Sequence, residues 1–297
     1  MGAFIRQNFG ILLLMSCIAG MFLPQPGKIT PLIVQFCLAF IIFCSFFQIN
    51  FNASVLFTDF KISLVYWGLR FVVIPVLLFF AFKWVSDFYA IVLLLTFLLP
   101  SAVSSPSFSA IYGGQPDLSM KILIYSSFLA VITLPFLLSH LLGSSVEISR
   151  NKMLMTLVYT IVIPFIAHLP LRKVPEVSGF INRYNALFTL LGLSTIFIIV
   201  TARNKADILD NLLRVGLYSA ISLVIYLSMY LIGYFLLPKQ TRVYKRTFSI
   251  SSGANNIGLG VTITALFFPG NINIFFIVSQ LMWVIMLVPL RRIFSHS

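Results

Sequence analysis

Apolar blocks of about 20 residues recur along the whole chain and constrain its fold more than any other feature. A helix of that length crosses the hydrocarbon core of a bilayer. Only 9% of the residues are charged, against about 25% in soluble domains. The pattern predicts an all-α polytopic membrane protein with ten transmembrane helices. The apolar blocks cover residues 8–24, 31–51, 62–85, 87–112, 116–142, 150–170, 183–202, 210–237, 242–268 and 271–293.

The basic residues lie between these blocks and give the chain a net charge of +13. In a soluble protein this excess would indicate nucleic acid. Between transmembrane helices it indicates orientation and contact with lipid headgroups instead, so the bilayer is the expected partner and nucleic acid is not. Lys and Arg are more frequent on the side that holds the N-terminus. We therefore expect both termini in the cytoplasm and the protein in the plasma membrane, the inner membrane of a bacterium.

Two of the blocks contain polar and helix-breaking residues at their centres. The fourth block contains LPSAVSSPSFSA (Leu99–Ala110), and the ninth contains SISSGANNIGLG (Ser249–Gly260). Such a run suits a helix that breaks inside the protein and lines a cavity with its freed backbone groups. Breaks in the fourth and ninth helices predict two five-helix repeats, residues 1–142 and 150–293, of inverted topology, as in secondary transporters. The alternative is that the small residues only allow close helix packing.

Enzyme and metal-binding motifs are not found in the sequence. Cys17, Cys37 and Cys44 all lie within apolar blocks and are expected to be core residues. There is no HExxH motif and no pair of aspartates or Ser–His pair at membrane depth. We therefore expect neither an enzyme nor a resident cofactor or metal.

The motifs in the broken helices resemble those of the bile acid–sodium symporter family. Pro100 and Ser105 match the family's fourth helix, and the run SSGANNIGL matches its ninth. The resemblance implies a panel domain of helices 1, 2, 6 and 7 and a core domain of helices 3–5 and 8–10. It also implies that the broken helices cross in the core, and that an organic anion is carried between the domains by alternating access.

The resemblance further implies where two sodium ions bind in relatives. The family's sodium-binding glutamate falls on Ser251, and a glutamine of the third helix falls on Arg70. The equivalent positions in this chain are Arg70, Ser105, Ser119, Lys121, Ser251, Ser252, Ala254 and Asn255.

An arginine in the middle of a transmembrane helix needs partners, because a central charge costs roughly 2.5–3.5 kcal/mol on insertion scales. We expect Arg70 to bind carbonyl groups freed near Ser251–Asn255, together with the Asn255 side chain, and to replace one sodium ion. The alternative is that Arg70 extends to the membrane surface. Lys121 is expected either to replace the second ion or to lie at the interface.

These residues predict an organic-anion carrier that does not require sodium. All seven acidic residues lie in loops or at helix ends, so no carboxylate remains for a hard cation that prefers anionic oxygen. One alternative is a sodium-coupled symporter that uses the remaining Ser, Asn and carbonyl ligands. Another is a sensor or scaffold that does not transport. Which anion is carried and the oligomeric state stay open.

The expected contacts with the anion come from the half-helices that follow the two breaks, because helix N-termini offer unpaired N–H groups. Gln280 is expected to face the same cavity or to form a hydrogen bond between helices. The predicted substrate-binding residues are Val103, Ser104, Ser105, Ser107, Asn256, Ile257, Gly258 and Gln280.

Overall fold

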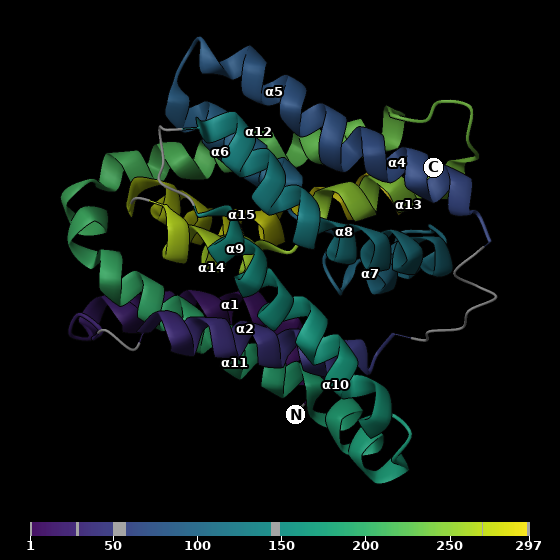
Figure 1. Ribbon diagram of the computed structural model, residues 1–297, viewed down its shortest axis with the longest axis horizontal. Helices are drawn as coiled ribbons and strands as arrows, with labels where there is room; N and C mark the ends of the chain where they lie inside the picture. The colour runs from purple at the N-terminus through teal and green to yellow at the C-terminus, as the bar shows by residue number, and fades with distance from the viewer. Residues whose placement is uncertain (1, 28–29, 50–57, 144–148, 269, 296–297) are drawn as a thin grey trace.

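The computed structural model describes residues 2–27, 30–49, 58–143, 149–268 and 270–295 (Figure 1). Within these ranges the chain is all-helical, and no extended strand forms. Two short π-helical segments, η1 and η3, interrupt longer helices. The elements are α1 (Gly2–Phe22), α2 (Thr30–Phe46), α4 (Phe60–Gly68), η1 (Leu69–Val73), α5 (Ile74–Lys83), α6 (Asp87–Leu98), α7 (Ser105–Ile111), α8 (Pro116–Leu142), α9 (Arg150–Leu157), η3 (Val158–Val162), α10 (Ile163–Leu171), α11 (Pro175–Asp210), α12 (Leu212–Phe235), α13 (Arg242–Gly253), α14 (Ile257–Phe267) and α15 (Gly270–Ser295).

Five continuous helical stretches are long and apolar enough to cross a membrane. They are Phe60–Lys83, Pro116–Leu142, Arg150–Leu171, Pro175–Asp210 and Leu212–Phe235. Shorter apolar helices accompany them in α1, α2, α6 and α14. A helix satisfies its own backbone groups, which is why helices suit apolar sequence inside lipid. The prediction of an all-α membrane protein is confirmed.

Several helices extend beyond their apolar blocks. The seventh block was expected at residues 183–202, whereas α11 runs from Pro175 to Asp210. Proline is favoured in the first turn of a helix, where its missing N–H costs nothing. The polar residues on both sides of the block continue the same helix, so hydropathy alone underestimates its length. The expected end of the second block, at residues 50 and 51, lies outside the described residues.

Both predicted helix breaks are present, and they bind each other. The first separates α6 from α7 at residues 99–104, and the second separates α13 from α14 at residues 254–256. The Ala102 N–H donates to the Ala254 carbonyl at 2.7 Å, and the Asn256 N–H donates to the Pro100 carbonyl at 2.7 Å. Ser101 and Asn255 thus form an isolated antiparallel bridge. These bonds satisfy backbone groups that the breaks would otherwise leave unpaired at membrane depth.

The helices gather in two groups in Figure 1. The lower group contains α1, α2, α10 and α11, and both α1 and α2 pack on α11. The upper group contains α4 to α8 and α12 to α15, with α12 packed on α13 and α15 and with α5 packed on α6. The two helix breaks belong to the upper group. The lower group reaches it through contacts of α2 and α11 with α14 and of α1 and α11 with α15, among others.

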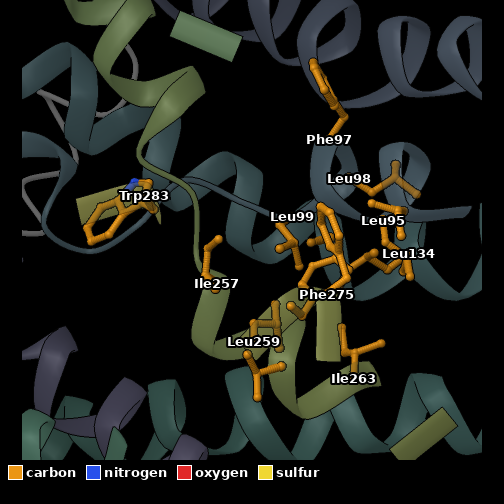
Figure 2. Close-up of a cluster of buried hydrophobic side chains, with 14 of the residues drawn as sticks. Leu95, Phe97, Leu98, Leu99, Leu134, Ile257, Leu259, Ile263, Phe275 and Trp283 are labelled. Atoms are coloured by element: carbon orange, nitrogen blue, oxygen red, sulfur yellow. The ribbon is translucent and has the colours of Figure 1, made fainter. Parts of the chain in front are cut away.

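Apolar side chains surround the paired breaks on the α14 side. Figure 2 shows Leu99 beside Phe275, with Ile257, Leu259 and Ile263 of α14 nearby. All five are buried. Phe97 points away from Leu99 and Phe275 in the same view. The breaks therefore lie in a packed interior rather than at a lipid-facing surface.

Candidate functional site

Arg70 lies in η1, and Pro75 explains why the helix is irregular there. Proline supplies no N–H, and its ring clashes with the carbonyl four residues earlier. The Ile74 N–H donates to the Leu69 carbonyl, five residues back, which is the pattern of a π turn. The extra residue in this turn sets the direction in which Arg70 leaves the helix. The π segment was not predicted from the sequence.

The Arg70 side chain is fully buried and is held by neutral oxygen atoms from two other helices. Its Nε donates to the Ser252 hydroxyl, and its Nη2 donates to the Ser252 carbonyl at 2.9 Å. Its Nη1 donates to the Phe97 carbonyl at 2.9 Å. The guanidinium carbon also lies 4.8 Å from the centre of the Phe71 ring and 4.7 Å from that of Phe97. The alternative that Arg70 extends to the membrane surface is therefore wrong.

The bound carbonyl groups explain how an arginine is tolerated at this depth. Ser252 lies in the last turn of α13, and Phe97 lies in the last turn of α6. Carbonyl groups at a helix C-terminus lack intrahelical partners and carry the negative end of the helix dipole. Aromatic faces attract a cation as well. The predicted contact with freed carbonyl groups near Ser251 is confirmed at Ser252, whereas the Phe97 carbonyl was not predicted.

Four serine hydroxyl groups continue the polar cluster away from Arg70. The Ser101 hydroxyl donates to the Ser251 carbonyl at 2.9 Å and lies 3.1 Å from the Ser105 hydroxyl. The hydroxyl groups of Ser119 and Ser251 are 3.0 Å apart. All four residues are buried. The structure therefore brings together Ser105, Ser119, Ser251 and Ser252, as the family resemblance implied, and it adds Ser101.

Asn255 and Ala254 take up positions in the break itself. The Asn255 side-chain amide donates to the Thr96 carbonyl at 2.9 Å. Its side-chain oxygen, which could accept from Arg70, has no hydrogen-bond partner among the described residues, so the expected contact with Arg70 is wrong. The Ala254 carbonyl accepts the Ala102 N–H. An asparagine amide has N–H donors of its own, and here one of them satisfies a carbonyl near the end of α6.

Lys121 makes other contacts than those expected. Its ammonium group donates to the Thr58 hydroxyl at 2.7 Å and lies 3.3 Å from the Asp59 carboxylate. Lys121 is 2% exposed. Its Cα lies about 200° around the helix from Ser119, which directs the side chain toward the start of α4. This ion pair corrects the expectation that Lys121 replaces the second sodium ion, and the alternative that it lies at the membrane interface stays a prediction.

A small cavity of about 20 Å³ lies between the lower and upper helix groups, next to the breaks. This space is about that of one or two water molecules. Val103 and Asn256, two of the predicted substrate-binding residues, line it. The other lining residues are Ile42, Ser45, Phe46, Ile49, Pro100, Leu123, Ile124, Ser127 and Ile161.

The other predicted substrate-binding residues are dispersed. Ser107 is exposed, Ser104 is half-buried, and Ser105 belongs to the serine cluster. Ile257 is buried, and a Cβ added at Gly258 would meet Leu193 and Leu38 of the lower group. Gln280 is buried, and its side-chain oxygen has no hydrogen-bond partner among the residues that the structure describes. Asn256 uses its side-chain oxygen to accept the Leu259 N–H at 3.1 Å and so caps α14.

Sequence reasoning missed three contributors to the cluster. Ser101 directly follows Pro100 inside the first break, which was a usable signal. Thr96 contributes only its backbone carbonyl group, and Phe97 contributes its carbonyl group as well as its ring. No side-chain pattern can reveal the two carbonyl groups. Carbonyl partners depend on where α6 ends, which the sequence places only approximately.

Continuous apolar helices, together with two broken helices that meet at a buried polar cluster, are a pattern that recurs in secondary transporters. The sequence matches the family model described as "Sodium Bile acid symporter family" over residues 35–211, which is more than half of the chain. The chain belongs to the sodium bile acid symporter family.

One curated relative is the uncharacterized protein YbaS of Bacillus subtilis (strain 168), which is 25% identical over 199 residues. The alignment covers 64% of this chain and 63% of that relative. The chain is therefore aligned with less than two thirds of the relative's length. The name of the relative assigns no activity to it.

Proposed function

We propose that the protein is a secondary transporter of a small organic anion that works by alternating access without bound sodium. It would catalyse no reaction. The observation that carries the proposal is the burial of Arg70 among the carbonyl groups of Ser252 and Phe97, with the Ser252 hydroxyl as a further partner. A fixed cation on these oxygen atoms would supply the positive charge that a mobile ion supplies in relatives.

The residues at this position do not fit a sodium ion. Sodium requires several oxygen ligands, and anionic ones bind it best. The oxygen atoms that a sodium ion would need at this position already accept hydrogen bonds from the Arg70 guanidinium group, which is always charged. A second cation at the same place would be repelled. An arginine tethered to the chain also cannot move down an ion gradient, so transport would follow the gradient of the anion itself.

The proposal includes the arrangement of the chain in the membrane. Ten crossings are formed by α1, α2, α4–α5, α6–α7, α8, α9–α10, α11, α12, α13–α14 and α15, as two inverted repeats over residues 1–142 and 150–293. The lower group, with α9, is the panel, and the upper group is the core. Both termini lie in the cytoplasm, and the membrane is the inner membrane of a bacterium.

The cavity supports movement between these two groups. At about 20 Å³ it is too small for a carboxylate with a carbon skeleton, and its lining comes from both groups. A substrate would need the groups to separate. The hydroxyl groups of Ser45 and Ser127 and the amide of Asn256 would offer hydrogen bonds in the opened cavity.

Flux into proteoliposomes tests the proposal. A panel of labelled carboxylates, from acetate to a bile acid, is assayed in sodium chloride and in choline chloride at equal ionic strength. We expect at least one anion to be carried at equal rates in the two salts. We expect Arg70→Gln to slow this flux at least tenfold in choline and Arg70→Lys to retain more of it, because lysine keeps the charge. A strict sodium requirement of the unmodified protein would overturn the proposal.

Sodium-coupled symport remains a second candidate because oxygen ligands persist around Ser119. The hydroxyl groups of Ser105, Ser119 and Ser251 are buried near one another, and the side-chain oxygen of Asn255 has no hydrogen-bond partner among the described residues. Thermal unfolding in sodium chloride and in choline chloride distinguishes the sodium-independent carrier from the sodium-coupled symporter. Binding to the folded state raises the unfolding temperature, so stabilisation by sodium relative to choline favours symport. Equal unfolding temperatures and no flux of any anion would favour a sensor or scaffold.

A further inference from the structure

A second and larger cavity opens on the lower helix group, away from the helix breaks. This groove has a volume of about 480 Å³, which is within the range of roughly 300–1,000 Å³ typical of small-molecule sites. Its walls come from α2, the end of α10 and the first third of α11. The lining residues are Phe40, Phe43, Cys44, Leu171, Glu176, Val177, Phe180, Ile181 and Phe188.

The walls of the groove are apolar and firmly held. The Phe40 and Phe188 rings meet edge to face at 5.5 Å, and the Phe180 and Phe188 rings are 6.0 Å apart. Beneath them the Asn185 side-chain amide donates to the Cys44 carbonyl at 3.2 Å and ties α11 to α2. Phe180 is 57% exposed, so the groove is open to the surroundings of the helix group. In a bilayer those surroundings are lipid chains.

Basic residues are placed at one end of this groove. Arg172 and Lys173 lie in the short connection between Leu171 and Glu176, and both of these neighbours line the groove. The connection is a tight turn, in which the Val174 N–H donates to the Leu171 carbonyl at 3.1 Å. Arg183 follows two residues after Ile181, another lining residue. Glu176 is the one acidic lining residue, so cations predominate around the groove.

We propose that the groove holds an acyl chain of an anionic phospholipid whose phosphate binds Arg172 and Lys173. The apolar walls suit the chain, and basic residues beside transmembrane helices attract anionic headgroups. The lipid would be bound by the panel and not by the transport cavity.

Charge also argues against a second copy of this chain as the occupant. A two-fold symmetric contact places the same surface on both partners. Dimerisation through the groove would therefore place Arg172, Lys173 and Arg183 of both copies in one interface, with Glu176 of each copy as the acidic lining residue to offset them. Phospholipid neutralises these cations instead.

Native mass spectrometry of the delipidated protein in mild detergent tests this inference. The protein is titrated with dioleoyl-phosphatidylglycerol and, separately, with dioleoyl-phosphatidylcholine. We expect the unmodified protein to bind the first about tenfold more tightly, since each basic residue near the headgroup contributes to the attraction. The double variant Arg172→Gln/Lys173→Gln should lose this preference. The matched control Arg150→Gln/Lys152→Gln removes the same two residue types from the exposed start of α9 and should keep it.

A third variant tests the groove apart from its charges. Val177→Trp fills the space and should reduce the binding of both lipids, with unfolding temperatures measured to show that the protein is still folded. Equal preference for phosphatidylglycerol in the protein and in Arg172→Gln/Lys173→Gln would overturn the inference. So would a dimer that Val177→Trp dissociates, because a second copy would then be the occupant.

Discussion

Arg70 shows how a chain can keep a cation in its interior without a carboxylate. The guanidinium group uses its planar fork to reach one hydroxyl and two carbonyl groups on two helices. A lysine ammonium group would present the same charge as a compact point with a different geometry. The identity of the side chain therefore matters as much as its charge, and Arg70 joins the end of α6 to the end of α13.

The Ser252 hydroxyl makes the contact at Arg70 Nε testable by substitution. Ser252→Ala removes an acceptor for a charged donor, and we expect the unfolding free energy to fall by about 1–3 kcal/mol. Ser249→Ala on the same helix is the control, because the Ser249 hydroxyl donates only to the neutral Tyr230 carbonyl. Thermal unfolding in detergent should show the larger loss for Ser252→Ala.

A double-mutant cycle with Arg70→Met isolates this interaction. After Arg70 is removed, Ser252→Ala should cost little, while the cost of Ser249→Ala should not change. If the two substitutions at Arg70 and Ser252 are additive, the hydroxyl stabilises the protein by some other contact.

At the scale of elements, the two interrupted transmembrane stretches contain an Ile-Pro pair at the same place. Pro75 follows η1 in the stretch Phe60–Lys83, and Pro164 follows η3 in the stretch Arg150–Leu171. The two π segments have the same length, but only η1 contains a charged residue. Comparison of the two stretches therefore separates the general effect of proline in a helix from the effect of Pro75 on Arg70.

Pro75→Ala should lower stability, although replacing an interior proline normally raises it. An alanine supplies the missing N–H and allows a regular helix, which would turn Arg70 by about 100° relative to α5. The three hydrogen bonds of Arg70 would then be lost or strained. Thermal unfolding of Pro75→Ala and Pro164→Ala checks this prediction, and the second variant should be as stable as the unmodified protein or more so. Stabilisation by both would show that the π turn does not position Arg70.

Asn256 makes a second prediction at the scale of elements. Its side-chain oxygen accepts the Leu259 N–H and begins α14 beside the break. Asn256→Ala should cost about 1 kcal/mol, as loss of an N-cap typically does. Asn256→Asp keeps an acceptor and places negative charge at a helix N-terminus, which is favourable. Circular dichroism during thermal unfolding should rank the aspartate variant above the alanine variant, and the reverse order would contradict the capping role.

The sequence predicted the two breaks well, because runs of serine, proline, glycine and asparagine at mid-membrane are poorly suited to a continuous lipid-facing helix. It also placed Arg70 near Ser252. It did not predict the π turns or the pairing of Lys121 with Asp59, which are 62 residues apart. Such contacts depend on the rotation and length of several helices at once. The mistaken partner of Asn255 has the same origin, since the Thr96 carbonyl becomes available only where α6 ends.

At the scale of the whole molecule, few direct hydrogen bonds join the two helix groups among the described residues. In one of them, Arg203 of α11 donates to the Ala265 carbonyl at 3.1 Å. Ala265 lies in the last turn of α14, where a cation is favoured. Two residues further along α11, Lys205 donates to the Leu23 carbonyl at 2.9 Å, which keeps its contact inside the lower group.

If the two groups separate during transport, the bond of Arg203 must break and that of Lys205 need not. Arg203→Gln should therefore shift the population toward a more open arrangement by about tenfold or more, as expected for one hydrogen bond from a charged donor of about 1.5–3 kcal/mol. Lys205→Gln should leave the population unchanged. The measurement is the rate at which a water-soluble maleimide labels Val103→Cys, which lines the cavity, in a background where Cys17, Cys37 and Cys44 are replaced by alanine. Equal labelling in the Arg203 and Lys205 variants would contradict this prediction, because it would mean that the two groups do not move apart at the contact of Arg203 with α14.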